Sequence, residues 1–298
     1  MKRKSLQQLP LHLMLLPGVI FTLIFSYIPM LGIVIAFQKF VPARGIFKSK
    51  WVGLENFIYL LDMPNTFQVL WNTVYIAIMK IIAGLIVPII ISLLLNEVGN
   101  KIFKRTVQTV VFLPYFLSWV ILGGILIDVL SPSDGIVNKF LGILGIEPIF
   151  FLGDDKVFPY TMVISDVWKN FGYSTVVYLA ALTNIDPGLY EAAIIDGAGH
   201  WKRTIHITLP GIVPIITLMA VLSLGNVLNA GFEQIFTLYS PLVYRTGDII
   251  DTFVYRIGMV NAQYGVATAV GLFKSVVSFM FIMLSNKLAY KYAGYRVL

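Results

Sequence analysis

Six apolar runs, each about as long as a bilayer is thick, constrain the fold of this 298-residue chain more than any other feature. They cover residues 11–37, 71–95, 107–130, 160–182, 212–234 and 262–284. A transmembrane helix needs about 20 predominantly apolar residues. The chain is 58% hydrophobic and 12% charged, whereas soluble domains are about 45–50% apolar and about 25% charged. We therefore predict an all-α, polytopic membrane protein with six transmembrane helices in a lipid bilayer.

The distribution of basic residues predicts the orientation of these helices. If the N-terminus is cytoplasmic, the inner segments hold eleven Lys and Arg residues and the outer segments hold eight. Short inner loops of membrane proteins carry an excess of such residues. The first apolar run is about twice as long as a secretory signal core, so we expect it to be retained as a span. The prediction is a multi-pass protein of the cell membrane with both termini in the cytoplasm.

The segment 186–210, between the fourth and fifth runs, is polar and carries signals for helix ends. Asp186 followed by Pro187 is a typical helix start, because Asp accepts from early N–H groups and Pro needs no acceptor there. Gly197 offers the positive φ that ends a helix. A second short helix should follow and end at Pro210. This unit either simply connects two spans or forms a small protrusion that binds another protein.

Several classes of chemistry find no support in the sequence. There is no cysteine, and the three histidines lack metal-binding spacing. No phosphate-binding loop is present, so any ATP would be bound by another subunit. The basic residues gather at the ends of apolar runs rather than on a basic and aromatic surface. We therefore expect no catalytic residue, no metal, no cofactor bound by this chain and no nucleic-acid partner.

The polar segment also resembles a known family. Its E-A-A, D-G-A and I-x-L-P elements are similar to the EAA loop of binding-protein-dependent ABC transporter permeases. The matching positions are Glu191, Ala192, Ala193, Asp196, Gly197, Ala198, Ile207, Leu209 and Pro210. The resemblance implies that this loop is a coupling helix, which docks in a cleft of a cytoplasmic ATPase. Glu191 is then the expected ion-pair partner for a basic ATPase residue.

The resemblance covers nearly the whole chain, and in the second half it narrows to LplB-like permeases of the carbohydrate uptake group. It implies the fold of a type I importer permease. It also implies a homologous second permease forming a heterodimer, two ATPase subunits that use ATP and Mg, and an extracytoplasmic substrate-binding protein. Residues 1–68 would form the N-terminal tail, the first span and an outer loop. Residues 69–298 would form the permease core of five spans, with the coupling loop at 186–210.

Polar and aromatic residues within the spans are the candidates for an oligosaccharide path. Intramembrane charges are costly and usually face a bundle interior or a wet cavity, and aromatic faces suit the C–H surfaces of sugars. The candidates are Asp166, Lys169, Asn170, Tyr173, Asn226, Asn229, Phe232, Glu233, Tyr264 and Lys274. The two lysines, Lys169 and Lys274, would suit an acidic sugar such as a uronate oligosaccharide.

Structural roles for the same residues stay open. Asp166 and Lys169, three positions apart, can pair with each other. Asn226 and Asn229 can bond neighbouring helices, Lys274 can extend to the interface, and Phe232 can simply pack.

Two other classes of function also stay open: an ion-driven secondary transporter, with intramembrane charges as the relay, and an integral membrane enzyme. Co-purification of an ATPase and a second permease would favour the importer.

Overall fold

The computed structural model describes residues 2–293, so that Arg296, counted among the basic residues of the C-terminal segment, lies outside the described range. Within that range the regular secondary structure is helical apart from one two-stranded antiparallel sheet. Contacts divide the chain into two compact units. Unit 1 comprises Met1–Thr66 and Phe253–Ser275, and unit 2 comprises Phe67–Thr252 and Val276–Leu298. The division predicted between residues 68 and 69 stays a prediction.

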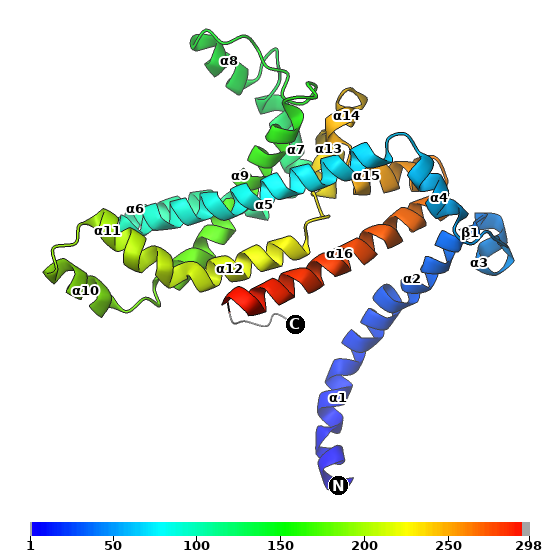
Figure 1. The fold of residues 1–298 in the computed structure, drawn as a ribbon, viewed down its shortest axis with the longest axis horizontal. Helices are drawn as coiled ribbons and strands as arrows, with labels where there is room; N and C mark the ends of the chain where they lie inside the picture. The colour runs from blue at the N-terminus through cyan, green and yellow to red at the C-terminus, as the bar shows by residue number, and fades with distance from the viewer. Residues whose placement is uncertain (1, 294–298) are drawn as a thin grey trace. The chain divides into compact units, whose positions relative to one another are not determined.

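Unit 1 is built around the first long helix and the beginning of the last one (Figure 1). Unit 1 also contains the two antiparallel strands, β1 (Gln38–Lys39) and β2 (Lys50–Trp51), in which Gln38 pairs with Trp51 and Lys39 with Lys50. Its elements are α1 (Lys2–Thr22), a π-helical turn η1 (Leu23–Tyr27), α2 (Ile28–Met30), the 3-10 helix η2 (Leu31–Phe37), β1 (Gln38–Lys39), η3 (Pro42–Arg44), α3 (Gly45–Lys48), β2 (Lys50–Trp51), α4 (Glu55–Asp62), η7 (Arg256–Val260), the end of α15 (Ile250–Tyr255) and the first part of α16 (Tyr264–Ala293).

Unit 2 contains most of the remaining helices, of which α5 and α9 are the longest (Figure 1). Its elements are α5 (Thr66–Glu97, from its second residue), α6 (Lys101–Phe112), the 3-10 turn η4 (Leu113–Phe116), α7 (Trp119–Val129), α8 (Ile136–Ile143), α9 (Phe158–Leu182), α10 (Pro187–Ile195), α11 (His200–Arg203), the π-helical turn η5 (Thr204–Thr208), α12 (Leu209–Gly225), α13 (Phe232–Leu238), η6 (Pro241–Val243), α14 (Tyr244–Gly247), the start of α15 and the rest of α16.

Four helices of the described residues are long and apolar enough to cross a membrane. They are His12–Phe37, Thr66–Glu97, His200–Gly225 and Tyr264–Lys287, and a bent pair of helices gives a fifth candidate. The remaining predicted span, the fourth (residues 160–182), corresponds to α9, which has 25 residues but a more polar sequence. The all-α membrane fold is confirmed. The count of six is compatible with these helices and stays a prediction.

The third predicted span, residues 107–130, is not one continuous helix. Lys101–Phe116 and Trp119–Val129 meet at an angle of 106° (Figure 1). Leu117 has extended backbone angles, and the Ser118 hydroxyl accepts a hydrogen bond from Ile121 N at 3.3 Å, which caps the start of α7. Pro114 lies in the preceding 3-10 turn. A capping serine after a proline turn therefore outweighs the continuous hydrophobicity of this run.

Two expected helix boundaries around the fifth run are also wrong. The helix that starts at His200 does not stop at Pro210 but continues to Gly225, because the π-helical turn η5 ends two residues before the proline and accommodates its missing N–H. The run predicted over residues 212–234 ends at Gly225. The chain then breaks before α13, and Gly231 adopts a left-handed φ of 94°.

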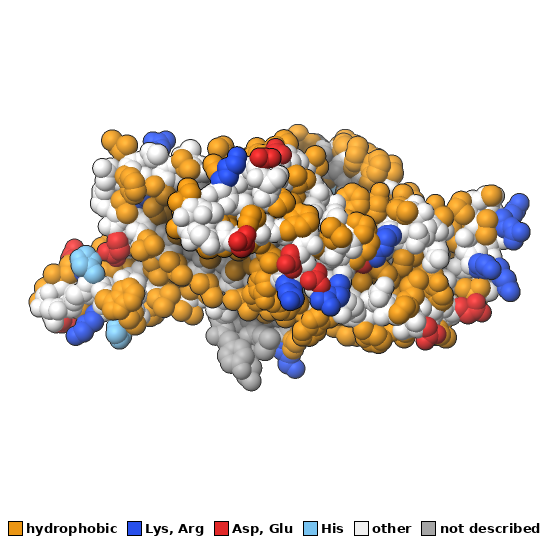
Figure 2. Space-filling model, turned by 90° about the horizontal axis from the view of Figure 1, so that it is seen from above, with side chains coloured by type: hydrophobic (Ala, Val, Ile, Leu, Met, Phe, Trp, Pro, Cys, Tyr) orange, Lys and Arg blue, Asp and Glu red, His pale blue; other side chains and the backbone are white. Residues whose placement is uncertain are grey.

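The core of unit 2 forms where α5, α7, α9 and α13 pack together. Ile76, Phe158, Met162 and Ile235 are fully buried there. Outside this core, hydrophobic side chains cover much of the face seen in Figure 2, with charged groups scattered between them. Large exposed apolar surface marks contact with lipid or with other proteins, so the protein's exterior matches that of a membrane protein.

Candidate functional site

The segment 186–210 forms a tightly capped turn between two helices. Asp186 Oδ1 accepts a hydrogen bond from Gly188 N at 2.9 Å, and α10 begins at Pro187, as predicted. At the other end Gly197 has a φ of 74°. Gly197 N donates to Ile194 O at 3.0 Å and Ala198 N to Ala193 O at 2.8 Å. This pair of bonds is the Schellman arrangement, which requires a left-handed residue at the position of Gly197.

The face presented by this turn is both charged and apolar. Glu191, Ala192, Asp196 and Gly197 are exposed, while Ala193, Ala198, Ile207 and Leu209 are half-buried and Pro210 is exposed. Ile195 and Trp201 are 86% and 77% exposed. Large apolar side chains at a solvated tip, rimmed by charges, are typical of a protein-protein contact.

The turn is linked to the long helices behind it by two side-chain contacts. The Tyr190 hydroxyl and Thr208 Oγ1 lie 3.0 Å apart and join α10 to η5. His200 Nδ1 lies 3.0 Å from Glu97 Oε2 and joins the start of α11 to the end of α5. These contacts connect α10 to the continuous helix that runs from His200 to Gly225, and that helix to α5.

A second candidate site is a cavity of about 280 Å³ inside unit 2. It brings together Asp166 from α9 and Asn226 and Asn229 from the break after α12, three of the residues predicted from sequence. Asn226 and Asn229 are exposed and Asp166 is half-buried. Amide and carboxylate groups around a cavity can exchange hydrogen bonds with a polyhydroxylated ligand.

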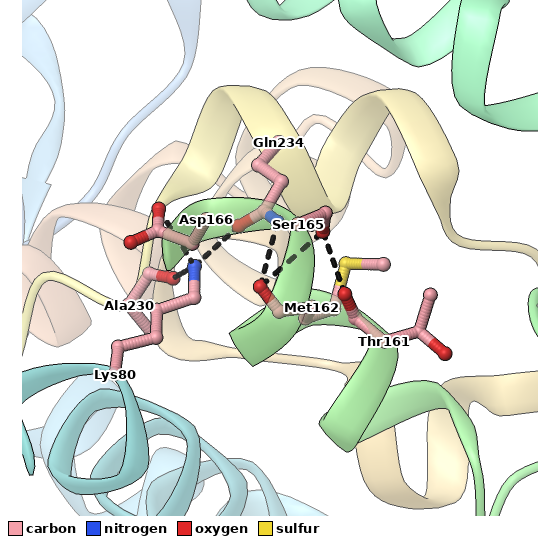
Figure 3. A network of polar contacts seen from close by, with 7 residues as sticks. All are labelled: Lys80, Thr161, Met162, Ser165, Asp166, Ala230 and Gln234. Atoms are coloured by element: carbon pink, nitrogen blue, oxygen red, sulfur yellow. Dashed lines mark hydrogen bonds and ion pairs between the residues drawn. The ribbon is translucent and has the colours of Figure 1, made fainter. Parts of the chain in front are cut away.

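Lys80, on α5, stands at the centre of a polar network at this cavity (Figure 3). Its Nζ lies 3.5 Å from Asp166 Oδ1, donates to Ala230 O at 2.7 Å and donates to Gln234 Oε1. Gln234 Nε2 in turn donates to Met162 O and to Ser165 Oγ, both at 2.8 Å. The network joins α5, α9 and α13 through buried polar groups, which must be satisfied in a dry interior.

Sequence reasoning did not select Lys80 or Gln234. The signal for Lys80 was present, because it is a charge in the middle of the apolar run 71–95, and such a charge usually marks a bundle interior. Gln234 lay at the predicted end of a span. The sequence left open whether Asp166 pairs with Lys169, and the structure pairs it with Lys80 instead.

Lys169 holds the bend between α6 and α7. Its Nζ donates to the carbonyl oxygens of Leu117 at 2.5 Å, Tyr115 at 2.9 Å and Pro114 at 3.4 Å, and it lies 5.6 Å from the centroid of the Trp119 ring. These contacts use the three donors of the ammonium group. Pro114 O also accepts from Leu117 N at 3.2 Å, so the lysine matters most for the carbonyl groups of Tyr115 and Leu117 at the end of the 3-10 turn.

The remaining predicted residues lie elsewhere. Tyr173 is 45% exposed and stacks on Tyr115 with centroids 4.9 Å apart. Phe232 stacks on Phe236 at 5.2 Å, Glu233 is exposed on α13, and Asn170 is half-buried on α9. Tyr264 and Lys274 belong to unit 1, where Lys274 is half-buried and Tyr264 lines a separate cavity.

Among the described residues no group of three or more His, Asp or Glu side chains is placed to hold a metal ion. The sequence already lacks a metal-binding pattern and a phosphate-binding loop. What the geometry defines is a polytopic membrane protein with a polar cavity between its helices and a rigid, exposed turn at one end of unit 2.

The chain matches the family model described as "Binding-protein-dependent transport system inner membrane component" over residues 80–291. It is 42% identical over 289 residues to the polygalacturonan/rhamnogalacturonan transport system permease protein YteP of Bacillus subtilis, covering 97% of this chain and 90% of that protein. It is 41% identical over 282 residues to the protein LplB of the same organism, covering 95% and 89%.

Solved structures extend this finding. A chain of the bacterial alginate ABC transporter, solved in complex with an alginate pentasaccharide-bound periplasmic protein, superposes with a TM-score of 0.90 and 37% identity, covering 99% of both chains. A chain of the MetNI methionine ABC transporter, 17% identical with a TM-score of 0.54, shares the fold.

The chain therefore belongs to the family of binding-protein-dependent transport system inner membrane components, and it is an ABC importer permease. The resemblance to LplB-like permeases is confirmed. The protein is an inner-membrane transport component and not an enzyme.

Proposed function

We propose that this chain is the permease subunit of an ATP-driven importer for oligosaccharides, specifically acidic fragments of polysaccharides. The names of the relatives support the substrate class. YteP is named for polygalacturonan and rhamnogalacturonan transport, and a structural neighbour is a chain of a bacterial ABC transporter involved in the import of the acidic polysaccharide alginate. The substrate would pass from an extracytoplasmic binding protein into the cavity lined by Asp166, Asn226 and Asn229.

The exposed turn over residues 186–210 is the observation that carries the transport mechanism. Its Schellman cap makes α10 a rigid body, and Glu191 and Ile195 are free of helix packing on their outer face. We assign α10 to a cleft of a separate ATPase subunit. Closure of the ATPase dimer would press on α10, and α11 and α12 would carry the movement toward the Asn226–Asn229 end of the cavity.

This role requires partners that supply energy and substrate. They are a homologous second permease in a heterodimer, two ATPase subunits that bind ATP and Mg, and the binding protein. The chain itself binds no cofactor in this proposal. Both termini lie in the cytoplasm, which places the turn on the same side as ATP. The division into residues 1–68 and a permease core of residues 69–298 belongs to the same proposal.

One observation favours an ion-driven carrier as a second candidate. The Lys80–Asp166 pair lies in the apolar part of the chain, where secondary transporters keep their proton or ion relays. The two candidates differ in their energy source, because only the importer depends on an ATPase subunit.

The test is uptake by the assembly reconstituted in proteoliposomes with its binding protein and trigalacturonate or trimannuronate. We expect ATP-dependent uptake that disappears when the ATPase carries a substitution that blocks hydrolysis. Uptake driven by a proton gradient without ATP would support the ion-driven carrier and overturn the importer. Maltotriose, which is neutral, tests the substrate class: equal uptake of both sugars would remove the acidic preference.

A further inference from the structure

Unit 1 contains a cavity of about 530 Å³ that no part of the proposed mechanism uses. Three segments form its walls: β1 with Phe40, the turn and helix after β2, and the turn before α16 with the start of that helix. The volume falls in the range of about 300–1,000 Å³ that small-molecule sites occupy. The composition of its walls identifies the class of ligand.

Three aromatic rings line this cavity. Phe40 and Tyr264 meet edge to face with centroids 5.9 Å apart, and Tyr59 on α4 is 48% exposed. Half-exposed aromatic rings at a cavity wall suit a ligand with one apolar face and polar edges. A pyranose ring has this character, because its axial C–H groups form an apolar face and its hydroxyl groups lie at the edge.

The polar wall offers an acceptor without a partner. Gln38 is only 7% exposed, and its Nε2 donates to Ile46 O at 2.9 Å. Its Oε1 is buried and accepts no hydrogen bond from any of the described residues. A buried acceptor without a donor costs about 1–3 kcal/mol. A small shift of the Gln38 side chain toward the cavity would let a ligand hydroxyl donate to Oε1 and remove this cost, and Glu55, which also lines the cavity, offers a further acceptor.

The same cavity offers donors for an anion. Lys39 lines it, and so do the first three residues of α16, including Tyr264 and Gly265. Ala267 N donates the first hydrogen bond of that helix, to Gln263 O at 3.0 Å, so the N–H groups of residues 264–266 precede the first helical donor. The N-terminus of a 30-residue helix attracts a carboxylate.

The beginning of α16 is held firmly against β1. A Cβ on Gly265 would lie 2.6 Å from Gln38 O. Before it, Ala262 has a φ of 54°, the only positive φ outside glycine among the described residues. Left-handed backbone at a non-glycine residue is strained, and such strain gathers at ligand-binding sites. The donors of α16 are therefore fixed in place relative to Gln38.

We propose that this cavity is a second saccharide site, selective for a sugar ring that carries a carboxylate. The rings contact the C–H face, Gln38 and Glu55 accept from hydroxyl groups, and Lys39 with the start of α16 binds the carboxylate. Because η2 continues the helix from the N-terminus, the cavity lies at the far end of the first span from that terminus. The inference rests on the proposed function, in which this end faces the binding protein and receives the acidic oligosaccharide.

The absence of native cysteine in this chain allows a site-specific test. A single cysteine is introduced at Val52, which lines the cavity, and in a second protein at Phe47, which is 101% exposed in the same unit and outside the cavity. Maleimide labelling of this chain is followed by mass spectrometry in the purified full assembly without binding protein. The probes are trigalacturonate, trimannuronate and maltotriose.

We expect at least one of the two uronates to slow labelling of Val52→Cys at least fivefold and to leave Phe47→Cys unchanged. Maltotriose should give the same protection only at a concentration at least tenfold higher than that of the uronate. Adding Tyr264→Leu or Gln38→Leu to Val52→Cys should abolish the protection. Equal labelling with and without both uronates, in an assembly that imports them, would overturn the site and leave the proposed function intact. Protection without import would support the site and overturn the proposed function.

Discussion

Lys80 on α5 and Asp166 on α9 form an ion pair with 3.5 Å between Nζ and Oδ1, although they are 86 positions apart in sequence. The same ammonium group donates to Ala230 O at 2.7 Å and to Gln234 Oε1. One ammonium group thus satisfies acceptors from three segments. The side chains of Lys80 and Asp166 are 10% and 24% exposed, so little water can replace either partner.

Replacing Lys80 should therefore destabilise the protein and block transport together. In Lys80→Met the acceptors of Gln234 and Ala230 lose their donor, at a cost of about 1–3 kcal/mol. We expect the unfolding temperature to fall by roughly 2–4 °C per kcal/mol, and uptake to fall at least tenfold. Lys139→Met, at an exposed site on α8, is the matched control. A Lys80→Met protein with unchanged uptake and melting would show that the network is dispensable.

The double variant Lys80→Met with Asp166→Asn separates the ion pair from the rest of the network. If the pair itself stabilises the fold, the double variant should be more stable than the sum of the two single changes predicts, by about 0.5–3 kcal/mol. Strict additivity would mean that Lys80 acts only through Ala230 and Gln234.

Gly231 gives a second prediction, at the break between α12 and α13. Its φ of 94° is left-handed, and a Cβ there would lie 2.9 Å from Lys80 Nζ. Gly231→Ala should lower stability by about 1–2 kcal/mol from backbone strain and disturb the ion pair as well. Gly271→Ala inside α16 is the control, because a Cβ at Gly271 meets nothing within 4 Å and alanine favours helix. This account would be refuted if Gly271→Ala unfolded at a lower temperature than Gly231→Ala.

Lys169 gives a third prediction, about the 106° bend between α6 and α7. Lys169→Met removes the donor to Tyr115 O and Leu117 O, so the turn should open more often. We expect amide hydrogen exchange over residues 113–118 to accelerate at least tenfold, while exchange in α12 stays unchanged. Lys169→Arg retains the charge and several donors and should preserve most of the protection. Equal exchange in wild type and Lys169→Met would show that packing alone maintains the bend.

The sequence predicts the elements whose signals are local. Asp186, Pro187 and Gly197 carry the capping chemistry of α10 within the segment itself, so both helix ends were found. Asp166, Asn226 and Asn229 were selected because polar groups in a bilayer are costly, and they do line one cavity. Both kinds of inference depend on a residue and its nearest neighbours, without knowledge of the tertiary arrangement.

What depends on distant partners was not predictable in the same way. Lys80 has its charge partner on another helix, and no local spacing indicates which acidic residue it meets. The bend at Leu117 had a signal, Pro114 followed by Ser118, but the length of the apolar run favoured a straight span. Near Pro210, the helix continues because the residues before the proline form a π-helical turn. Whether such a turn forms depends on the conformation of several consecutive residues.

The charge of the substrate is tested by a fourth prediction. If Lys274 helps to stabilise an anionic sugar, Lys274→Met should reduce uptake of trigalacturonate or trimannuronate about fivefold or more and leave maltotriose uptake within twofold of wild type. A positive charge lowers the cost of bringing an anion into the bilayer. The comparison uses both sugars in the same proteoliposomes, with and without the substitution. Equal loss for the two kinds of sugar would assign Lys274 a structural role.

The fifth prediction concerns the turn at residues 186–210. In Gly197→Asp the added Cβ meets no atom within 4 Å, so the change does not crowd the core, but the φ of 74° becomes strained and a carboxylate is added at the exposed tip. We expect normal insertion into the membrane and continued ATP hydrolysis by the assembly, with uptake at least tenfold lower. ATP hydrolysis and uptake are measured on the same proteoliposomes.

Gly199→Asp is the matched control for charge, because Gly199 has a φ of −68°, which any residue can adopt, and also meets nothing within 4 Å. If the geometry of the Schellman cap transmits force, Gly197→Asp should uncouple the assembly much more than Gly199→Asp. Equal uncoupling would show that the added charge is the cause, since the backbone is strained in only one of the two variants. Normal uptake by Gly197→Asp would remove α10 from the path between ATP hydrolysis and the cavity, because that path requires the rigid connection that Gly197 provides.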